Sequence, residues 1–163
     1  ITGVAAGMRP TGQAAVCFKP ASGQGFAAAS EELQDLLELA VKEAGSTLRI
    51  TDDSYGYRWV VLADPEVEDL VTAVHLVNST LEQYGFGPQL LCSVLGFTEG
   101  GGAGRRFYLV YLYTRATFYP FAPLGGERRD NELELRVKAT LAGDMPIEPE
   151  LSRWFALWGL PLD

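Results

Sequence analysis

The residues of this sequence that could do chemistry are few, and none has the neighbours that a known reaction needs. The single histidine, His75, has no serine or cysteine nucleophile motif to serve, and a metal site there would need ligands from elsewhere in the chain. Cys17 and Cys92 each lie inside an apolar run, which favours two buried free thiols in a reducing compartment over a disulfide or a reactive cysteine. We therefore expect His75 at the boundary of the core, and no catalytic residue, cofactor or metal site.

Two other patterns have a local structural explanation. The run from Gly100 to Gly104 lacks the Gly-Lys-Ser/Thr ending of a Walker loop and the helix that follows Rossmann glycines, so it is typical of a flexible hairpin tip. Arg105 and Arg106, directly after it, leave contact with an anion open. The grouped acids lie in a predicted turn or at a helix start, where carboxylates stabilise the backbone: Asp52, Asp53, Glu66, Glu68 and Asp69.

Size and charge restrict the class of protein. The chain has 163 residues, 47% of them hydrophobic and 21% charged, which is typical of one globular domain over residues 1–163, with residues 1–12 irregular. Its 21 acidic and 13 basic residues give a net charge of −8, which argues against nucleic acid and anionic membrane surfaces as partners. No run approaches the ~18 apolar residues of a membrane span, and we expect a cytoplasmic protein. The first residue is Ile1 and not Met, so we expect a trimmed start, and a preceding segment could hold an anchor.

Three segments have the apolar spacing of helices. The first begins at Ser30 as N-cap and ends at Gly45, and the second has Asp64 as N-cap, Pro65 at its first position and Gly85 at its end. A third helix is predicted over residues 150–158, where apolar residues surround most of the circumference.

The remaining pattern predicts strands. They are expected at residues 13–18, 47–51, 57–63, 89–97, 105–113, 117–121 and 132–138. Residues 89–97 and 105–113 form a hairpin, and the alternation of charged and apolar residues over 132–138 predicts a half-exposed strand near the sheet edge. This order contains no βαβ alternation. It predicts an α+β fold of two layers, with helices packed on a mainly antiparallel sheet.

Two strands predict that both faces of the sheet are covered. Residues 90–97 and 107–113 are apolar or aromatic on both alternating faces. The last helix, an oligomer partner or a ligand could cover the second face, and we favour the last helix. Residues 117–123 interleave three aromatic residues with two prolines, which gives a stiff apolar surface. That surface either forms an interface or packs over the edge of the core.

Several strings together resemble a known family. They are Arg9-Pro10-Thr11-Gly12, Ala15-Val16-Cys17-Phe18-Lys19-Pro20, Asp53-Ser54-Tyr55-Gly56-Tyr57-Arg58-Trp59, Gly85-Phe86-Gly87-Pro88-Gln89-Leu90-Leu91-Cys92, Phe118-Tyr119-Pro120-Phe121-Ala122-Pro123, and Arg153-Trp154-Phe155 with Trp158-Gly159. In this order they resemble the PspA-associated protein family PspAB of bacteria and archaea. The resemblance implies a link to the phage-shock, or envelope-stress, response, in which PspA-type coiled-coil proteins guard the cytoplasmic membrane. It brings no catalytic residues.

The order of elements also resembles the folds of type III secretion chaperones and YbjN-like proteins, which bind protein segments and often dimerise. This is an analogy of fold alone. Our leading hypothesis is a non-enzymatic adaptor or chaperone-like domain that binds a protein partner, such as a PspA-type coiled-coil protein. It would insert into no membrane itself, and peripheral association with the inner membrane through partners stays open. The candidate interaction surface comprises Tyr111, Tyr113, Phe118, Tyr119, Phe121, Trp154 and Trp158.

Two rivals remain. One is a small-ligand sensor or an uncharacterised enzyme with an aromatic pocket, whose lining residues would be Trp59, Tyr111, Tyr113 and Tyr119, with Arg105, Arg115 or His75 supplying polarity. The other is a homodimer that shares the aromatic surface.

Overall fold

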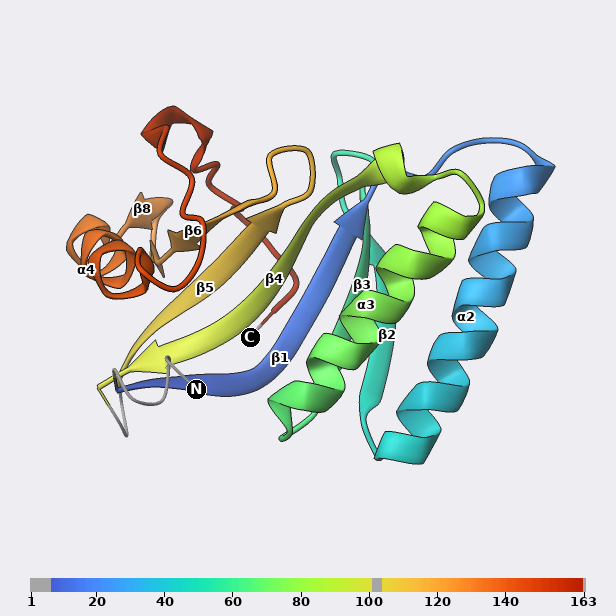
Figure 1. Ribbon diagram of the computed structural model, residues 1–163, viewed down its shortest axis with the longest axis horizontal. Helices are drawn as coiled ribbons and strands as arrows, with labels where there is room; N and C mark the ends of the chain where they lie inside the picture. Colours follow the sequence, from blue (N-terminus) through green and yellow to red (C-terminus); the bar gives the residue numbers. More distant parts are fainter. Residues whose placement is uncertain (1–6, 101–103, 163) are drawn as a thin grey trace. The chain divides into compact units, whose positions relative to one another are not determined.

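The computed structural model describes residues 7–100 and 104–162. Within them one six-stranded antiparallel sheet has the order β2-β3-β1-β4-β5-β6, and three helices pack on it (Figure 1). The strands of this sheet are β1 (Met8–Phe18), β2 (Thr47–Asp52), β3 (Arg58–Ala63), β4 (Leu90–Glu99), β5 (Arg105–Leu112) and β6 (Thr117–Phe121). The helices are α2 (Gln24–Ala44), α3 (Val67–Gln83) and α4 (Asn131–Leu141). The predicted α+β class with an antiparallel sheet is confirmed.

The short elements are the ribbon of β7 (Pro123–Leu124) with β8 (Arg128–Arg129), and two 3-10 turns, η1 (Gly87–Gln89) and η2 (Leu151–Arg153). The chain forms two compact units. We call residues 12–93 with 162–163 the N-terminal unit, and residues 1–11 with 94–161 the C-terminal unit. Strands β1 and β4 have residues in both units. The organisation as one domain over 1–163 stays a prediction.

In the N-terminal unit, α2 and α3 pack on each other, α2 contacts β2, and α3 contacts β3. β3 pairs with β1 on one side and with β2 on the other, so that Val60 lies opposite both Val16 and Ile50. Residues opposite one another in an antiparallel pair point to the same face of the sheet. The helix-facing side chains of the three strands therefore form rows beneath α2.

Helix α2 is longer than the sequence indicated. It begins at Gln24, so the prediction of Ser30 as N-cap is wrong. The extra turns already bury Phe26, whose ring lies 6.2 Å from Phe18 and 5.0 Å from Phe86 between centroids. The helix ends as predicted at Gly45, which adopts the left-handed conformation (φ 73°) that glycine tolerates best.

Helix α3 lies where the sequence placed it, with a start two residues later than expected. The residue preceding the helix is Glu66, and Val67 is its first residue. Asp64 still fixes the entry to the helix, because its Oδ1 accepts a hydrogen bond from the Glu66 backbone N–H at 2.7 Å. The prediction of Asp64 as N-cap and Pro65 as the first helical residue is therefore wrong by two residues.

In the C-terminal unit, α4 packs on β5 and β6. The core beneath it consists of Met8, Phe107, Leu109, Ala122, Leu133, Val137 and Leu141. The predicted strands at 105–113 and 117–121 are confirmed as β5 and β6, with Val110 opposite Tyr119. The prediction of a flexible tip falls on residues 101–103, which lie outside the described residues.

The predicted edge strand at 132–138 is wrong, because this segment belongs to helix α4. Leu133, Val137 and Leu141 recur every fourth residue and are all buried, whereas Leu135 is half exposed. Asp130 caps the helix by accepting a hydrogen bond from the Leu133 backbone N–H at 3.1 Å. The three buried leucine and valine side chains and the Asp130 cap favour a helix, although the alternation of charged and apolar residues is typical of a strand.

The predicted last helix over 150–158 is also wrong, since only the 3-10 turn η2 forms there. The backbone carbonyls that a helix would use accept side-chain hydrogen bonds instead. The Trp154 carbonyl accepts from Arg129 Nη1 at 2.5 Å, and the Phe155 carbonyl accepts from the Tyr119 hydroxyl at 2.7 Å. At the other end of the chain, β1 begins at Met8, so residues 8–12 are not irregular as predicted.

The irregular segment nevertheless does what was expected of the last helix. Trp154 stacks on Tyr119 with 6.2 Å between ring centroids, and Trp158 meets Phe121 edge-on at 5.3 Å. Tyr119 and Phe121 belong to the face of β6 opposite the row that includes Phe118, by strand alternation. The chain therefore covers the second face of this strand itself.

Among the described helices, none combines the length and the apolar character needed to cross a lipid bilayer.

Candidate functional site

The aromatic residues predicted as an interaction surface are largely packed inside the C-terminal unit. Tyr119 and Phe121 are fully buried, and Trp154 is 6% exposed. Tyr111, Tyr113 and Phe118 are half-buried and contact one another, with ring centroids 4.8 and 5.2 Å apart. The buried rings offer a partner no surface in this conformation. A binding role for the half-buried ones, Trp158 among them, stays a prediction.

The polar residues predicted for a ligand pocket have other tasks. Trp59 is buried in the N-terminal unit, and its indole N–H donates to Asp53 Oδ2 at 3.0 Å. Arg105 pairs with Asp130, and His75 lies exposed on α3. Arg115 donates from Nε and Nη2 to the two carboxylate oxygens of Glu148, at 2.9 and 3.1 Å. Trp59, Arg105 and Arg115 are thus each engaged with a carboxylate, and a ligand pocket formed by these residues stays a prediction.

Two buried carboxylates of the C-terminal unit, Glu148 and Glu134, hold several hydrogen-bond donors each. Glu148 is fully buried and accepts hydrogen bonds from Arg115 and from the Thr117 hydroxyl at 2.8 Å. The hydrogen bonds from Arg115 lower the pKa of Glu148 to about 2, so it stays ionised. Glu134, 3% exposed, accepts from the Ala122 backbone N–H at 2.9 Å and from Arg129 Nε at 2.8 Å. Both acids have complete structural roles.

The two thiols lie in the interior of the protein. Cys17 and Cys92 are free and buried, as predicted. A hydrogen bond to the Cys92 thiol, together with burial, raises the pKa of Cys17, which disfavours the nucleophilic thiolate. Across the described ranges, no group of three or more histidines, cysteines and carboxylates could hold a metal ion.

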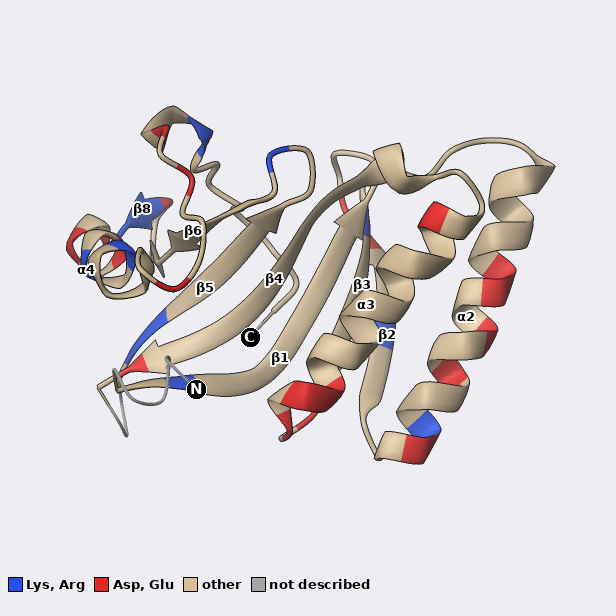
Figure 2. Ribbon diagram, in the orientation of Figure 1, with Lys and Arg blue, Asp and Glu red and all other residues tan. Residues whose placement is uncertain are grey.

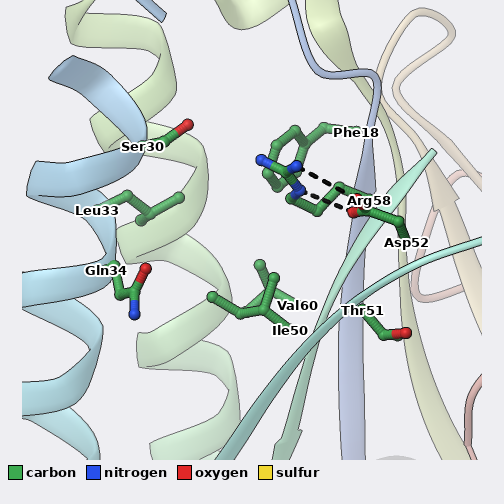
Figure 3. A pocket seen from close by; sticks show the side chains of 9 residues that line it. All are labelled: Phe18, Ser30, Leu33, Gln34, Ile50, Thr51, Asp52, Arg58 and Val60. Carbon is green, nitrogen blue, oxygen red and sulfur yellow. Dashed lines mark hydrogen bonds and ion pairs between the residues drawn. The ribbon is translucent and has the colours of Figure 1, made fainter. Parts of the chain in front are cut away.

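The N-terminal unit contains an open hollow of about 390 Å³ between α2 and the strands (Figure 3). Its lining residues are Phe18, Ser30, Leu33, Gln34, Ile50, Thr51, Asp52, Arg58 and Val60. The register explains the floor: Phe18 lies opposite Arg58, Arg58 opposite Asp52, and Val60 opposite Ile50. The wall comes from one face of α2, where residues three and four apart are neighbours. Four of the nine lining residues are apolar, and five are polar or charged.

The charged groups of the hollow neutralise each other. Arg58 donates from Nε and Nη2 to the two carboxylate oxygens of Asp52, at 2.8 and 3.3 Å. The same hydrogen bonds lower the pKa of Asp52. Ser30 is different: its hydroxyl is buried, it has no hydrogen-bond partner within the described structure, and Figure 3 shows it pointing from α2 towards the side of the hollow where Phe18 and Arg58 lie. A ligand that entered the hollow could satisfy this hydroxyl.

The hollow adjoins strand β2, which lies at one end of the sheet order. As far as the structure describes the chain, β2 pairs with β3 alone. The strand is largely exposed, and Ile50 is 39% exposed although it lines the hollow. The other end of the sheet is different, because residues 146–148 run along β6. There the Phe118 N–H donates to the Pro146 carbonyl and the Glu148 N–H donates to the Phe118 carbonyl, at 2.9 and 2.7 Å.

Charge is distributed unequally between the units. Residues 12–93 contain twelve acidic and four basic residues, a balance of −8, which equals the net charge of the whole chain. Residues 1–11 and 94–161 contain eight acidic and nine basic residues. Figure 2 shows acidic positions along α2 and at the start of α3. The hollow and β2 therefore belong to the acidic unit.

Sequence reasoning missed this site. Its residues are ordinary ones, and the hollow depends on the distance between α2 and β2, which no local pattern encodes. One available signal was the short strand Thr47–Asp52, in which Leu48 and Ile50 alternate with polar residues. That pattern predicts an edge strand with one apolar face.

The family description adds a biological context. A family model described as PspAB, PspA associated protein B, matches residues 2–162. The chain belongs to the PspAB family. This confirms the resemblance carried by the aromatic, glycine and proline strings, and the family description links PspAB proteins to PspA. A search of curated protein sequences gave no significant match.

Proposed function

We propose that this PspAB protein is a non-enzymatic adaptor, which binds a segment of a PspA-type protein through the surface around its hollow. The observation that carries the proposal is the hollow itself. It opens to solvent, four of its nine lining residues are apolar, and its two charged residues are paired with each other. Such a surface can bind a side chain, and the pairing leaves neither Asp52 nor Arg58 free to act on one as an acid or a base.

The family description supports PspA as the system in which the partner is found. Acting through such a partner, the protein would work in the cytoplasm and reach the inner membrane only peripherally. Its charge agrees with this role, since a net charge of −8 repels anionic lipids and nucleic acids alike.

The small-ligand sensor keeps one argument in its favour. A volume of about 390 Å³ falls within the range of small-molecule sites, about 300–1,000 Å³. A ligand site also needs several polar groups that converge on the ligand. Here Asp52 and Arg58 satisfy each other, which leaves Ser30 and Gln34 on the wall and Thr51 at the floor. We therefore favour a protein segment.

The test uses purified components. The full chain and the PspA-type protein from the same organism are mixed, and binding is measured by sedimentation velocity and isothermal calorimetry. We expect a complex that a Leu33→Glu variant weakens, because this change places an unpaired charge in the wall of the hollow. Val71→Glu, which adds the same charge at an exposed position on α3, is the control. Absence of a complex with the unchanged chain would refute the adaptor.

A further inference from the structure

The outward backbone groups of β2 follow from the hydrogen bonds around it. The Asp53 N–H donates to the Tyr57 carbonyl at 2.9 Å, so residues 53 and 57 form a hydrogen-bonded pair at the end of the β2–β3 ladder. Such pairs alternate along antiparallel strands. Thr51 and Arg49 therefore direct their backbone groups towards β3, whereas Leu48, Ile50 and Asp52 direct theirs away from it.

An independent bond on the other side of β3 agrees with this assignment. The Asp64 N–H donates to the Gly12 carbonyl at 2.8 Å, one pair beyond Ala63 opposite Gln13. By the same alternation, Leu62, Val60 and Arg58 bond to β1. The residues of β3 that remain for β2 are then Ala63, Val61 and Trp59, which are those opposite Thr47, Arg49 and Thr51.

The outward backbone groups and the hollow belong to the same residues. Ile50 and Asp52 line the hollow with their side chains, and their N–H and C=O groups face the open edge. A strand added at this edge would place the side chain opposite Ile50 on the same face of the sheet. That side chain would lie beside Ile50, at the edge of the hollow. Backbone pairing and one side-chain pocket are the two elements of recognition by strand addition.

Charge decides which occupant fits. A second copy of the chain would bring another set of residues 12–93, with a balance of −8, against the first, and like charges opposed across an interface are unfavourable. Near the hollow, Gln34 donates to Glu38 Oε1 at 3.2 Å, so this carboxylate lies beside the wall. Glu31 lies three residues before Gln34, on the same face of α2. A basic segment is the complementary partner.

We infer that the β2 edge is the docking site: an extended segment of the PspA-type partner, with lysine or arginine flanking an apolar residue, adds as a strand beside β2 and inserts the apolar side chain into the hollow. This inference rests on the proposed function, from which it takes the partner. The chain already uses this mode of pairing at β6, where its own residues 146–148 run alongside the strand.

The experiment uses a synthetic probe, the peptide Lys-Val-Lys-Leu-Lys-Val-Lys with blocked ends, and a glutamate counterpart in which every lysine is replaced. Binding to the full chain is measured by fluorescence anisotropy. We expect the lysine peptide to bind and the glutamate peptide not to bind. Amide hydrogen exchange, read by NMR, should slow at Leu48, Ile50 and Asp52 when the lysine peptide binds. No binding of the lysine peptide, or protection confined to other strands, would overturn the inference.

Matched variants separate site from charge. Ile50→Lys and Val71→Lys add the same positive charge to the same unit, at positions 39% and 53% exposed. We expect Ile50→Lys to weaken peptide binding about tenfold or more, as at an interface hot spot. Val71→Lys should weaken it only about threefold or less, as expected of a rim charge. Equal weakening by both would mean that the acidic surface attracts the peptide without a site.

A backbone variant tests the pairing directly. Ile50→Pro removes an N–H that faces the open edge and not β3, and proline is tolerated on edge strands. Its circular dichroism should match that of the unchanged chain while peptide binding is lost. If Ile50→Pro does not fold, Ile50→Thr replaces it. This variant keeps the N–H but reduces the apolar contact. The proposal is supported if the peptide binds more weakly and the bound peptide still slows amide exchange along β2. Unchanged peptide affinity opposes it.

The same variants distinguish the inference from the proposed function. If the PspA-type protein binds the unchanged chain and Ile50→Lys equally well, the adaptor stands and the β2 site is wrong. If it binds neither, while the peptide protects β2, the adaptor is wrong and the strand-addition site stands. A dimer of the chain that Ile50→Lys dissociates would assign the edge to a second copy and overturn the proposed occupant.

Discussion

Replacing Glu134 by alanine should lower the free energy of unfolding by about 3–5 kcal/mol, the range for breaking a buried ion pair. Its carboxylate, 3% exposed, holds two donors. Without it, the Ala122 N–H loses its acceptor, which costs about 1–3 kcal/mol when the group is buried. Arg129, whose side chain is 20% exposed, loses a charge-assisted hydrogen bond worth about 1.5–3 kcal/mol. Together the two contributions come to about 2.5–6 kcal/mol, a span that includes the stated range.

The control is Glu132→Ala on the same helix. Glu132 is 76% exposed and pairs with arginines at 3.2 and 3.4 Å, and exposed pairs of this kind contribute about 0–1 kcal/mol. Urea denaturation followed by tryptophan fluorescence compares the free energies of unfolding of the two variants. Trp154 is a suitable probe because Arg129 also donates a hydrogen bond to its carbonyl. If the free energies of unfolding of the two variants differed by less than about 1 kcal/mol, this would refute the claim that Glu134 stabilises the protein by holding Ala122 and Arg129.

Two further outcomes are expected from the C-terminal unit. Hydrogen bonds from Arg115 lower the pKa of Glu148 from 4.5 to about 2, so the stabilisation from its ionised form is complete above pH 4.5 and lost as the pH falls towards 2; thermal unfolding across this window should therefore depend on pH more steeply in the unchanged chain than in Glu148→Gln. In Gly96→Ala the added methyl would collide with the Thr11 hydroxyl, so we expect a loss of about 1–3 kcal/mol in urea denaturation; Gly125→Ala, where the methyl meets no atom within 4 Å, should be nearly neutral, and equal effects would contradict the packing argument.

Local signals predicted most of the N-terminal unit. The two strands around the turn at Asp53 are confirmed as β2 and β3. The Asp53 carboxylate stabilises the turn between them by accepting hydrogen bonds from the Tyr55 and Tyr57 N–H groups, at 2.8 and 2.9 Å. Helix α3 was predictable because its buried residues recur at helical spacing and its ends carry recognisable residues. In these segments the neighbours in sequence are also the partners in space.

The C-terminal unit was harder to predict because its decisive contacts join distant residues. Arg115 and Glu148 are 33 residues apart, and Ala122 and Glu134 are 12 apart. The bonds to Glu148 and to the carbonyls of Trp154 and Phe155 hold residues 146–158 in an irregular path. The apolar composition of that segment therefore indicated its burial correctly, but the prediction of a helix there was wrong. At 132–138, alternation of charge and apolar residues fits both a strand and a helix. Tertiary packing of Leu133 and Val137 decided between them.

The candidate site could not be read from residue types, because aromatic residues indicate that a surface will be covered but not what covers it. In the C-terminal unit the chain covers its own rings, as Tyr119 beneath Trp154 illustrates. In the N-terminal unit the open surface consists of common residues around Ile50 and Ser30. An interface there would bury little aromatic area and would depend on backbone pairing and charge. Its binding should accordingly weaken with salt, whereas binding through Tyr111, Tyr113 and Phe118 would be driven by apolar contact and would change little. The salt dependence of the complex with the PspA-type protein thus separates the two surfaces before any residue is changed.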